Sequence, residues 1–453
     1  MAFHPVAEPA GSVSATTALI QAAIDRCHSD GGGLVVLVGG RRFVCGTLHL
    51  RSGVELLLES GCVLAASRDQ ADFQERAFGG EYGGSSGSFL ILAEDCQNVA
   101  ITGPGTIDGD SLAWMKGWRD PEGRYIRDPK DWRPRGIGLY FCSGVRLEQF
   151  TMRDIAQWTI HLTGCDDVVC HALTIRNRLD VPNCDGIDPD RCRNVRISDC
   201  HIEAGDDGIV LKNTRQFAGR GDCTDIVISN CTIVSTSAGL KIGTESHGDF
   251  RRIAMTGCVI RGSHRGLAIQ LRDHGTVEDI LFANCLIETR HFHGGWWGHG
   301  EPVAITAMPR DGSTVPGRIR RVRLAGLMLR GENGIVIHGN DRAPIEDLTL
   351  DGIDLEIEQR SRWPGGQLDL RPRFGAEHGG SEPHPNPGVL LRHGRNLTLR
   401  HVAVRWRGTP QPWWSHAIDA ADIVGLEMSA CTGIAGKAGL PAVLRQRCTA
   451  EDG

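Results

Sequence analysis

The sequence lacks the features that would place it in several broad classes of protein. No apolar run approaches the roughly 18 residues of a transmembrane helix, and 49 basic against 55 acidic side chains give a net charge of −6, which offers no basic surface for nucleic acid. The N-terminal stretch MAFHPVAEPAGSVSA has neither the basic start nor the apolar core of a signal peptide. We therefore expect a soluble, cytoplasmic protein that binds neither nucleic acid nor membrane.

Paired cysteine motifs are also missing, although cysteine itself is not scarce. The chain has 16 cysteines but no C-x-x-C, and a C-x7-C spacing runs from Cys184 to Cys192 and again to Cys200. Zinc sites need several ligands clustered at short spacing. We expect buried, reduced thiols and neither a metal nor another cofactor.

One segment alone shows convincing helical periodicity. In TTALIQAAIDRCHSDGGG, from Thr16 to Gly33, apolar residues recur at helical spacing before a glycine stop, at Leu19, Ile20, Ala23 and Ile24. Glycine is abundant elsewhere, at 59 of 453 residues or about 13% against a typical ~7%, and it follows no collagen-like period. The composition predicts short strands and many tight turns, with a helix at the N-terminal end.

The dominant pattern is a repeat of about 27 residues. Apolar-x-apolar pairs begin at Val145, Val168, Val195, Ile226, Ile253, Ile280, Val322, Leu348, Leu397 and Ile423, at steps of 23, 27, 31, 27, 27, 42, 26, 49 and 26 residues. This period, with strand-like alternation, is typical of a solenoid of β-strand coils, whereas propeller blades need about 40 to 45 residues. We predict an all-β solenoid of parallel coils about 4.8 Å apart, capped by the N-terminal helix, as a single domain over residues 1–453.

Cysteines and insertions follow from this register. Cys200, Cys231, Cys258 and Cys285 hold the same place in RNVRISDCHIE, TDIVISNCTIV, RRIAMTGCVIR and VEDILFANCLIE, which predicts an interior column of thiols. Inserted loops are expected at 110–135 and 291–316, which carry five of the ten tryptophans. The segment 365–387 is rich in glycine, proline and charge and predicts a mobile loop.

Three acidic motifs on neighbouring coils carry the predicted chemistry: NCDGIDPD at 183–190, EAGDDGIVLK at 203–212 and GLKIGTESHGDF at 239–250. Asp185 and Asp206 are 21 residues apart, about one coil, and Asp207 follows, so the three carboxylates would meet if they share one corner. Crowded carboxylates repel when ionised, which keeps a proton available beside a general base, as glycoside cleavage requires. A plain Asp-Asp-Gly turn, or a calcium site that also uses Asp188 and Asp190, is the alternative.

With these motifs the sequence resembles glycoside hydrolase family 28, the polygalacturonases and their relatives. The resemblance covers most of the chain, through GTLHLRSGVELLLESGCVL and NVAITGPGTIDGDSLAW in the N-terminal third and NCDGIDPDRCRNVRISDCHIEAGDDGIVLK in the centre. It implies a right-handed parallel β-helix and an inverting hydrolase. It further implies that Asp206 is the general acid, that Asp185 and Asp207 activate the attacking water, and that Asn183 orients that group.

Two departures from the family pattern bear on the substrate. Polygalacturonases carry a Gly-His-Gly whose histidine is Ala238 here, and an Arg-Ile-Lys for the uronate carboxylate, where this chain has Ala268-Ile269-Gln270. A sugar carboxylate bound without its cations would cost several kcal/mol. We expect a neutral or differently charged glycan, unless Lys241, Arg265 or Arg272 replaces those cations.

The candidate binding residues surround the acidic motifs. Trp158 and His161 offer a ring platform and a hydrogen-bond partner. The loop HFHGGWWGHGEP at 291–302 is too polar for a core and suits a sugar-binding wall, or a metal held by its histidines. His247 is the candidate substitute for the missing histidine. The predicted substrate-binding set is Trp158, His161, Asn183, Lys241, Glu245, His247, Gln270, Arg272, Trp296, Trp297 and Glu301.

The sequence therefore predicts a glycosidase with a carbohydrate substrate, attacking from one end because its loops are large. A uronate-directed lyase or epimerase on the same fold is an alternative that needs the missing cations. A non-catalytic carbohydrate-binding β-helix is a second alternative, although it has no use for three crowded carboxylates. The sugar, the linkage and the possibility of a homo-oligomer stay open.

Overall fold

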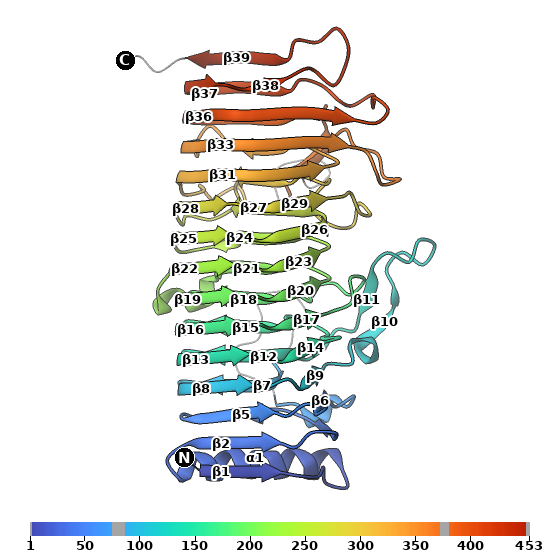
Figure 1. Cartoon of the computed structure of the whole chain (residues 1–453), viewed down its shortest axis with the longest axis vertical. Helices are drawn as coiled ribbons and strands as arrows, with labels where there is room; N and C mark the ends of the chain where they lie inside the picture. Colours follow the sequence, from blue (N-terminus) through green and yellow to red (C-terminus); the bar gives the residue numbers. More distant parts are fainter. Residues whose placement is uncertain (1, 75–86, 372–379, 450–453) are drawn as a thin grey trace. The chain divides into compact units, whose positions relative to one another are not determined.

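The computed structural model describes residues 2–74, 87–371 and 380–449, which fall into two units. Unit 1 comprises Met1–Val210 and Gly219–Gly221, and unit 2 comprises Leu211–Ala218 and Asp222–Gly453. Within each unit, short parallel strands stack coil upon coil (Figure 1). The fold class is the predicted right-handed parallel β-helix with an N-terminal helix. The prediction of a single domain stays a prediction.

Unit 1 contains three ladders of parallel strands, one strand of each ladder per coil. The first contains β2 (Gly33–Leu37), β5 (Val54–Leu58), β8 (Gln97–Thr102), β13 (Ser143–Glu148), β16 (Asp166–His171) and β19 (Arg193–Ser198). The second contains β3 (Arg42–Cys45), β6 (Val63–Ala66), β9 (Thr106–Asp108), β14 (Thr151–Arg153), β17 (Thr174–Arg176) and β20 (His201–Ala204). The third contains β4 (Leu48–His49), β7 (Phe89–Glu94), β12 (Arg135–Tyr140), β15 (Ile160–Thr163) and β18 (Ile187–Asp190).

Unit 2 repeats this plan with longer strands toward its end. Its first two ladders contain β22 (Cys223–Ser229), β25 (Phe250–Thr256), β28 (Val277–Ala283), β23 (Thr232–Ser235), β26 (Val259–Ser263), β29 (Leu286–Thr289), β31 (Ile319–Gly331), β33 (Ile345–Glu358), β36 (Val389–Arg407), β37 (Ile418–Ser429) and β38 (Thr432–Gly433). Its third contains β24 (Ala238–Ser246), β27 (Arg265–Leu271), β30 (Val303–Ala307), β32 (Ile335–His338), parts of β36 and β37, and β39 (Val443–Thr449). β21 (Ile209–Asn213) contains the point where the chain passes from unit 1 to unit 2. Three 3-10 turns are η1 (Gln70–Asp72), η2 (Ser111–Trp114) and η3 (Arg215–Arg220).

Alternation of side chains fills the interior of the coils. In β5, Val54, Leu56 and Leu58 are buried, while the residues between them are half-buried. Successive side chains of a strand point to opposite faces, so one face of each strand supplies the core and the other faces outward. The outward face is where functional side chains can be placed without disturbing the core.

The N-terminal helix α1 (Val13–Ser29) lies beside β1 (Ala2–Val6), which pairs with β2 (Figure 1). It begins earlier than the predicted Thr16 because the Ser12 hydroxyl accepts a hydrogen bond from the Ala15 N–H at 3.1 Å. Ile20, Ala23 and Ile24 are buried as expected, but Leu19 is 38% exposed. Among the described residues, no helix is both long and apolar enough to cross a membrane.

The predicted register holds for most of the repeat. Val145 pairs with Val168 and Val168 with Val195, and in unit 2 Ile253 pairs with both Ile226 and Ile280. The last step is wrong, since Ile423 pairs with Gly394, whereas Leu397 pairs with Leu426. β36 and β37 are continuous strands, so the register fixed at their first pair, Val389 with Ile418, extends to the end.

The predicted loops contain strands. Within 110–135, β10 (Met115–Trp118) and β11 (Arg127–Pro129) form an antiparallel ribbon that extends away from the coils of unit 1 (Figure 1). The segment 291–316 includes β30, which is part of a coil and not of a loop. Within 365–387, β34 (Gln367–Asp369) and β35 (Ser381–Pro383) pair antiparallel, and residues 372–379 lie outside the described residues.

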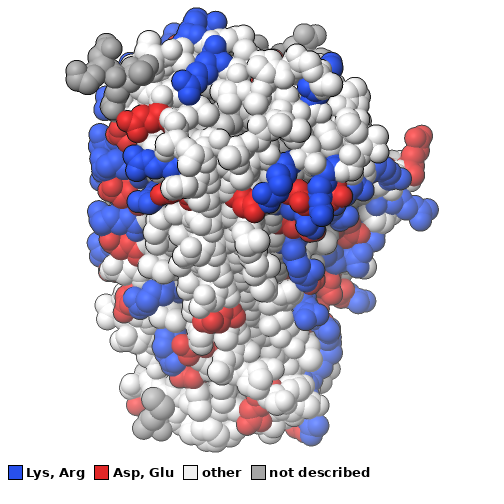
Figure 2. All heavy atoms as spheres, turned by 45° about the horizontal axis from the view of Figure 1, so that its top comes forward, with Lys and Arg blue, Asp and Glu red and all other residues white. Residues whose placement is uncertain are grey.

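Exposed charges are largely paired with charges of opposite sign. Arg252 binds Asp225 at 2.6 Å and Arg321 binds Asp279 at 2.7 Å, in both cases between neighbouring coils of unit 2. Figure 2 shows basic and acidic side chains interleaved on the face it draws. Each exposed pair contributes only about 0–1 kcal/mol, and this mixed surface agrees with the mild net charge.

The thiol column is present in unit 2. Cys231, Cys258 and Cys285 are buried and free, and the Cys258 thiol hydrogen bonds with the thiols of both neighbours. The Cys231 thiol and burial raise the pKa of Cys258 to about 12. All sixteen cysteines lie in described parts of the chain and none forms a disulfide.

We expect Cys231, Cys258 and Cys285 to resist a thiol reagent in the native protein at pH 8 and to react fully after unfolding. A pKa of about 12 leaves a thiolate fraction on the order of 10⁻⁴ for Cys258 at that pH. Mass spectrometry of peptides from timed labelling measures this directly. Cys431 and Cys448, which are not fully buried, provide the internal comparison, and equal labelling rates at all five sites would contradict the coil register.

Candidate functional site

Three carboxylates meet in unit 1 where two successive coils turn into their third-ladder strands. Asp185 lies just before β18, and Asp206 and Asp207 lie just before β21. The Gly186 N–H donates to the Asp207 carbonyl at 2.9 Å, which fixes the two turns in register. Asp185, Asp206 and Asp207 each offer a carboxylate oxygen within 4.8 Å of the other two. The structure thus brings together the three residues that the sequence singled out.

The three carboxylates differ in exposure. Asp185 is 4% and Asp207 3% exposed, whereas Asp206 is half-buried. Asp206 can therefore contact a bulky ligand, while Asp185 and Asp207 are accessible only to something small beside it. Gly205 permits this arrangement, because a Cβ there would lie 2.2 Å from the Val181 carbonyl oxygen.

The geometry weakens the calcium alternative. Asp188 and Asp190 lie along β18, where they pair in register with His161 and Thr163 of β15, and not with the cluster at the turn. Calcium takes six to eight oxygen ligands, and three carboxylates converge here. The donor set is a better match to proton transfer than to calcium binding.

Asn183 connects this cluster to a buried arginine that the sequence analysis missed. The Asn183 backbone N–H donates to Asp206 Oδ2 at 3.2 Å, and its side-chain amide to the same oxygen at 3.5 Å. Arg133 Nη2 donates to Asn183 Oδ1 at 2.8 Å. Arg133 falls in a predicted loop with no motif around it, so no signal in the sequence links it to position 183.

Trp158 and His161 form a packed layer and not an open platform. The Arg135 guanidinium lies 4.3 Å from the centre of the Trp158 ring, and Trp158 is 8% exposed. His161 is 1% exposed, with Tyr140 Oη at 3.1 Å from its Nδ1 and Asp190 at 3.6 Å from its Nε2. The expected ring platform is covered because Arg135, on the preceding coil, stacks on it.

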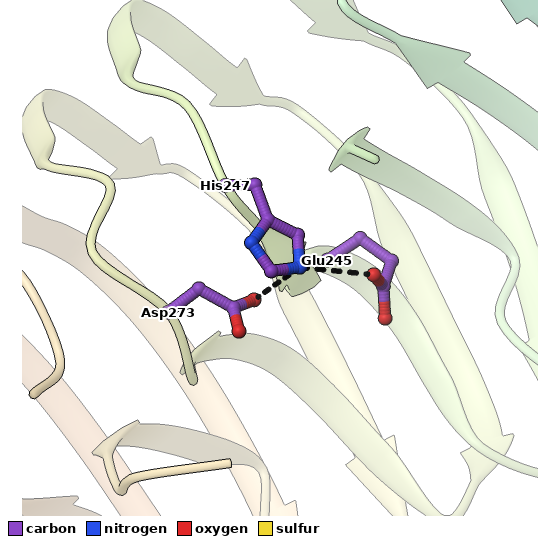
Figure 3. Close-up of side chains that lie close together, drawn as sticks. All are labelled: Glu245, His247 and Asp273. Atoms are coloured by element: carbon purple, nitrogen blue, oxygen red, sulfur yellow. Dashed lines mark ion pairs between the residues drawn. The ribbon is translucent and has the colours of Figure 1, made fainter. Parts of the chain in front are cut away.

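A second polar cluster lies in unit 2, where Glu245 and His247 flank Ser246 and Asp273 comes from the next coil (Figure 3). His247 Nε2 is 3.8 Å from Glu245 and 3.5 Å from Asp273. Arg310 donates to Glu245 Oε1 at 3.0 Å and to both oxygens of Asp273 at 2.7 and 2.9 Å. Figure 3 shows the imidazole between the two carboxylates.

These residues could converge on a cation, but their contacts argue against one. Asp273 Oδ2 already accepts from the Ser246 N–H at 3.0 Å and from Arg310. Burial would raise the pKa of Asp273, but the hydrogen bonds and charge of Arg310 outweigh it and lower the pKa. Burial also lowers the pKa of His247, an effect that Asp273 partly offsets. A divalent cation would have to displace Arg310, so the cluster fits a guanidinium-bridged network better than a metal centre.

Gln270, at one of the family's two cation positions, and Arg272, a candidate substitute, are both bound by the 367–371 segment of unit 2. Gln270 Nε2 and Arg272 Nη2 both donate to the Arg371 carbonyl. Lys241 is 5% exposed and pairs in register with Ala268, with its Nζ 5.9 Å from the centre of the Trp297 ring. Of these side chains, only Trp297 is substantially exposed, at 37%.

The 291–302 loop is mostly buried, in contrast to the expected sugar-binding wall. Trp296, His291, His299 and Glu301 are all less than 9% exposed. Asp369 receives the Gly298 N–H, and Arg265 binds Glu301 at 3.3 Å and Asp369 at 3.4 Å. The insertion that carries Asp369 folds over this loop and buries it, which its local composition could not indicate.

The buried histidines of this region do not form a metal site. His291 Nε2 and His299 Nδ1 lie 2.9 Å apart in a mutual hydrogen bond, and the rings of His264 and His291 stack at 24°. Burial lowers the pKa of His264 and His299, and lowers that of His291 to about 3. All three are therefore neutral at pH 7, and one nitrogen each of His291 and His299 is used in their mutual hydrogen bond.

These histidines predict a loss of stability in mild acid. A histidine with a lowered folded-state pKa stabilises the protein above its unfolded pKa of about 6.5, and this contribution falls as pH decreases toward the folded value. His291→Gln should reduce the decrease in the free energy of unfolding between pH 7 and pH 5 by about 1–2 kcal/mol. Urea unfolding at pH 7, 6 and 5 measures it. His401, whose side chain is 70% exposed, gives the matched control His401→Gln. Identical pH slopes for wild type and His291→Gln would contradict a buried, neutral His291.

Comparisons with known proteins agree with the fold, and the segment that a family model matches includes the acidic turns. Residues 69–294 match the family model of glycosyl hydrolases family 28. A probable polygalacturonase of Vitis vinifera is 28% identical over 50% of this chain and 47% of its own, and an endo-polygalacturonase of Pectobacterium parmentieri is 28% identical over 52% and 60%. The chain thus spans about half to three fifths of the length of these relatives.

Solved structures show the same fold over more of the chain. A hyperthermoactive exopolygalacturonase from Thermotoga maritima superimposes with a TM-score of 0.66 at 22% identity, over 87% of this chain and 88% of that one. A polygalacturonase from Erwinia carotovora gives 0.60 at 23% identity, over 78% and 92%. At these identities the likeness establishes the β-helix and nothing about the substrate.

Proposed function

Because the chain belongs to glycoside hydrolase family 28, we propose that it is a glycosidase that hydrolyses an O-glycosidic bond of an oligosaccharide or polysaccharide. The observation that carries the proposal is the convergence of Asp185, Asp206 and Asp207 within 4.8 Å in unit 1. A binding protein would gain nothing from three mutually repelling carboxylates, whereas hydrolysis needs an acid and a base side by side.

Exposure and hydrogen bonding suggest the role of each residue. Asp206, the half-buried member, donates its proton to the glycosidic oxygen as the bond to the anomeric carbon breaks. Asp185 and Asp207, both almost fully buried, hold a water and accept its proton as the water oxygen bonds to that carbon. Asn183 keeps the Asp206 carboxyl oriented through its two donors.

Inversion is the stereochemical course that we propose, on the strength of the family resemblance. The nearest oxygens of the cluster, within 4.8 Å of each other, are closer than the roughly 6.5–9.5 Å that typically separates acid and base in inverting enzymes. The water would then lie against Asp185 and Asp207 together, beside the acid, and not in a wide gap between two single carboxylates. Spacing alone favours retention, so the anomeric configuration of the product decides the point.

A neutral glycan is the better candidate substrate. Gln270 and Arg272 are engaged by the Arg371 carbonyl, and Arg265 by Glu301 and Asp369. Arg265 is 3% and Arg272 0% exposed, so neither guanidinium is open to a sugar carboxylate in this arrangement. The third cation that could replace the missing pair, Lys241, is 5% exposed and has its Nζ 5.9 Å from the centre of the Trp297 ring.

Attack from one end of the substrate is supported by the insertion that contains β34 and β35. Its Leu368 and Leu370 pack with Val336 of β32, Leu390 of β36 and Met308 in a buried apolar cluster. This packing covers the outward face of the third ladder of unit 2. A polysaccharide lying along that face of unit 2 would meet the insertion, which is the kind of obstruction expected of an enzyme that attacks a chain end.

Asp206→Asn should abolish proton donation and leave the fold intact. Turnover of substrates with poor leaving groups should fall about 10²- to 10⁴-fold, and that of activated aryl glycosides much less. Initial rates on matched aryl glycosides measure the effect, with Asp341→Asn, an 89% exposed aspartate, as the control.

Proton NMR of fresh wild-type product should show the inverted anomer. A retained anomer would make one aspartate a nucleophile, and an unsaturated product would indicate a lyase.

Polygalacturonate should be a poor substrate. Without a cation pair for each bound carboxylate, reducing-end release should be about 10- to 100-fold slower than from the best neutral oligosaccharide in the same screen. Chromatography of early time points should show a single short product. Comparable rates on polygalacturonate would disprove the substrate proposal, and a ladder of product sizes would disprove attack from one end.

A further inference from the structure

We propose that Arg133 is a positioning residue that acts through Asn183 to hold the Asp206 carboxyl in place for proton transfer. The proposal rests on the proposed glycosidase function. It assigns a task to the 110–135 insertion, whose ribbon precedes Arg133 in the chain. All the residues involved lie in unit 1.

Arg133 donates hydrogen bonds to residues of two successive turns. Arg133 is 5% exposed, and its Nη1 donates to the carbonyls of Ala156 at 2.8 Å and Pro182 at 2.6 Å. Nη2 donates to Asn183 Oδ1 at 2.8 Å. These three bonds go to neutral oxygens, while the charges of Asp206 and Asp185 favour the protonated guanidinium and partly offset the cost of its burial. Burial lowers the pKa of Arg133 to about 10, so it stays protonated at neutral pH. A buried positive charge, that of Arg133, is therefore placed next to Asn183, the residue that contacts Asp206.

The bond to Asn183 determines which way its amide points. Because Oδ1 accepts from Arg133, the amide nitrogen is directed to Asp206 Oδ2, together with the Asn183 backbone N–H. Asn183 is exposed, so its side chain is held by its hydrogen bonds to Arg133 and Asp206 more than by packing around it. Removing Arg133 would therefore release the donor that orients the acid, without removing the acid itself.

The ribbon is tied to the same turn at a second point, which provides a control. The Arg127 N–H donates to the Asp180 carbonyl at 2.7 Å, and Arg127 Nε donates to the Asp180 carboxylate at 3.0 Å. Arg127 thus anchors the turn without contacting Asn183 through these bonds. If anchoring of the turn were all that mattered, Arg127 and Arg133 variants would behave alike.

The test compares Arg133→Gln, Asn183→Ala, the double variant and Arg127→Gln on matched 4-nitrophenyl and phenyl glycosides that the wild type cleaves. Arg133→Gln should lower kcat on the phenyl glycoside about 10- to 100-fold and on the activated one less than about 3-fold, with KM little changed. The double variant should be no slower than the slower single variant, because both remove one function. Arg133→Lys should recover part of the loss.

Three outcomes would overturn the proposal: equal losses on both leaving groups, additive losses in the double variant, or the same leaving-group profile in Arg127→Gln. A crystal structure of Arg133→Gln provides a readout that is independent of turnover, and it should show the Asn183 amide rotated away from Asp206. An unchanged Asn183 in that structure would also disprove the proposal. Failure of the glycosidase function itself would appear separately, as a wild type without activity or an Asp206→Asn variant that keeps it.

Discussion

Parallel hydrogen bonding between successive coils is the constraint on which the other features of each unit depend. Once one residue of a strand is paired, every later residue of the strand has a fixed neighbour about 4.8 Å away. This is why residues separated by a coil length, such as Asp185 and Asp206, come to the same turn. It is also why Cys231, Cys258 and Cys285 form a column whose thiols contact one another. Residues that are one period apart in the sequence therefore lie next to each other in the folded chain. Side chains that must converge for catalysis can come together at any corner where successive coils turn.

The insertions act on this frame from outside the coils. In unit 1 the ribbon of β10 and β11 leads to Arg133, which holds the turn that carries Asn183. In unit 2 the segment with β34 covers the outward face of β32 and β36 through an apolar cluster. Insertions of this kind alter access and side-chain orientation while the register of the coils stays the same. A change in these insertions can therefore change which ligands reach the coils without changing the coils themselves.

Buried polar groups in unit 2 show how much of the structure depends on paired charge. Burial alone would raise the pKa of Asp369, yet Arg265 and Arg371 outweigh it and keep the carboxylate ionised. Arg310 has the same effect on Asp273. The neutral histidines His264, His291 and His299 lie beside the first of these networks and contribute no charge to it at neutral pH. Such networks fix a unique arrangement, because a buried charge that loses its partner costs several kcal/mol.

The β-solenoid, the coil length, most of the register and the meeting of the three aspartates could be predicted from the sequence, because these follow from alternation and period. The sequence did not determine that Trp158 would be covered by Arg135, that the 291–302 loop would be buried, or that Gln270 and Arg272 would bind Arg371. Nor could it link Arg133 to Asn183, which lie 50 residues apart in the chain. The period describes the coils alone, whereas an insertion has no period and its side chains find their partners through contacts that only the folded chain creates. Local pattern therefore specifies the frame, and tertiary packing decides which of its outward-facing residues remain open to a ligand.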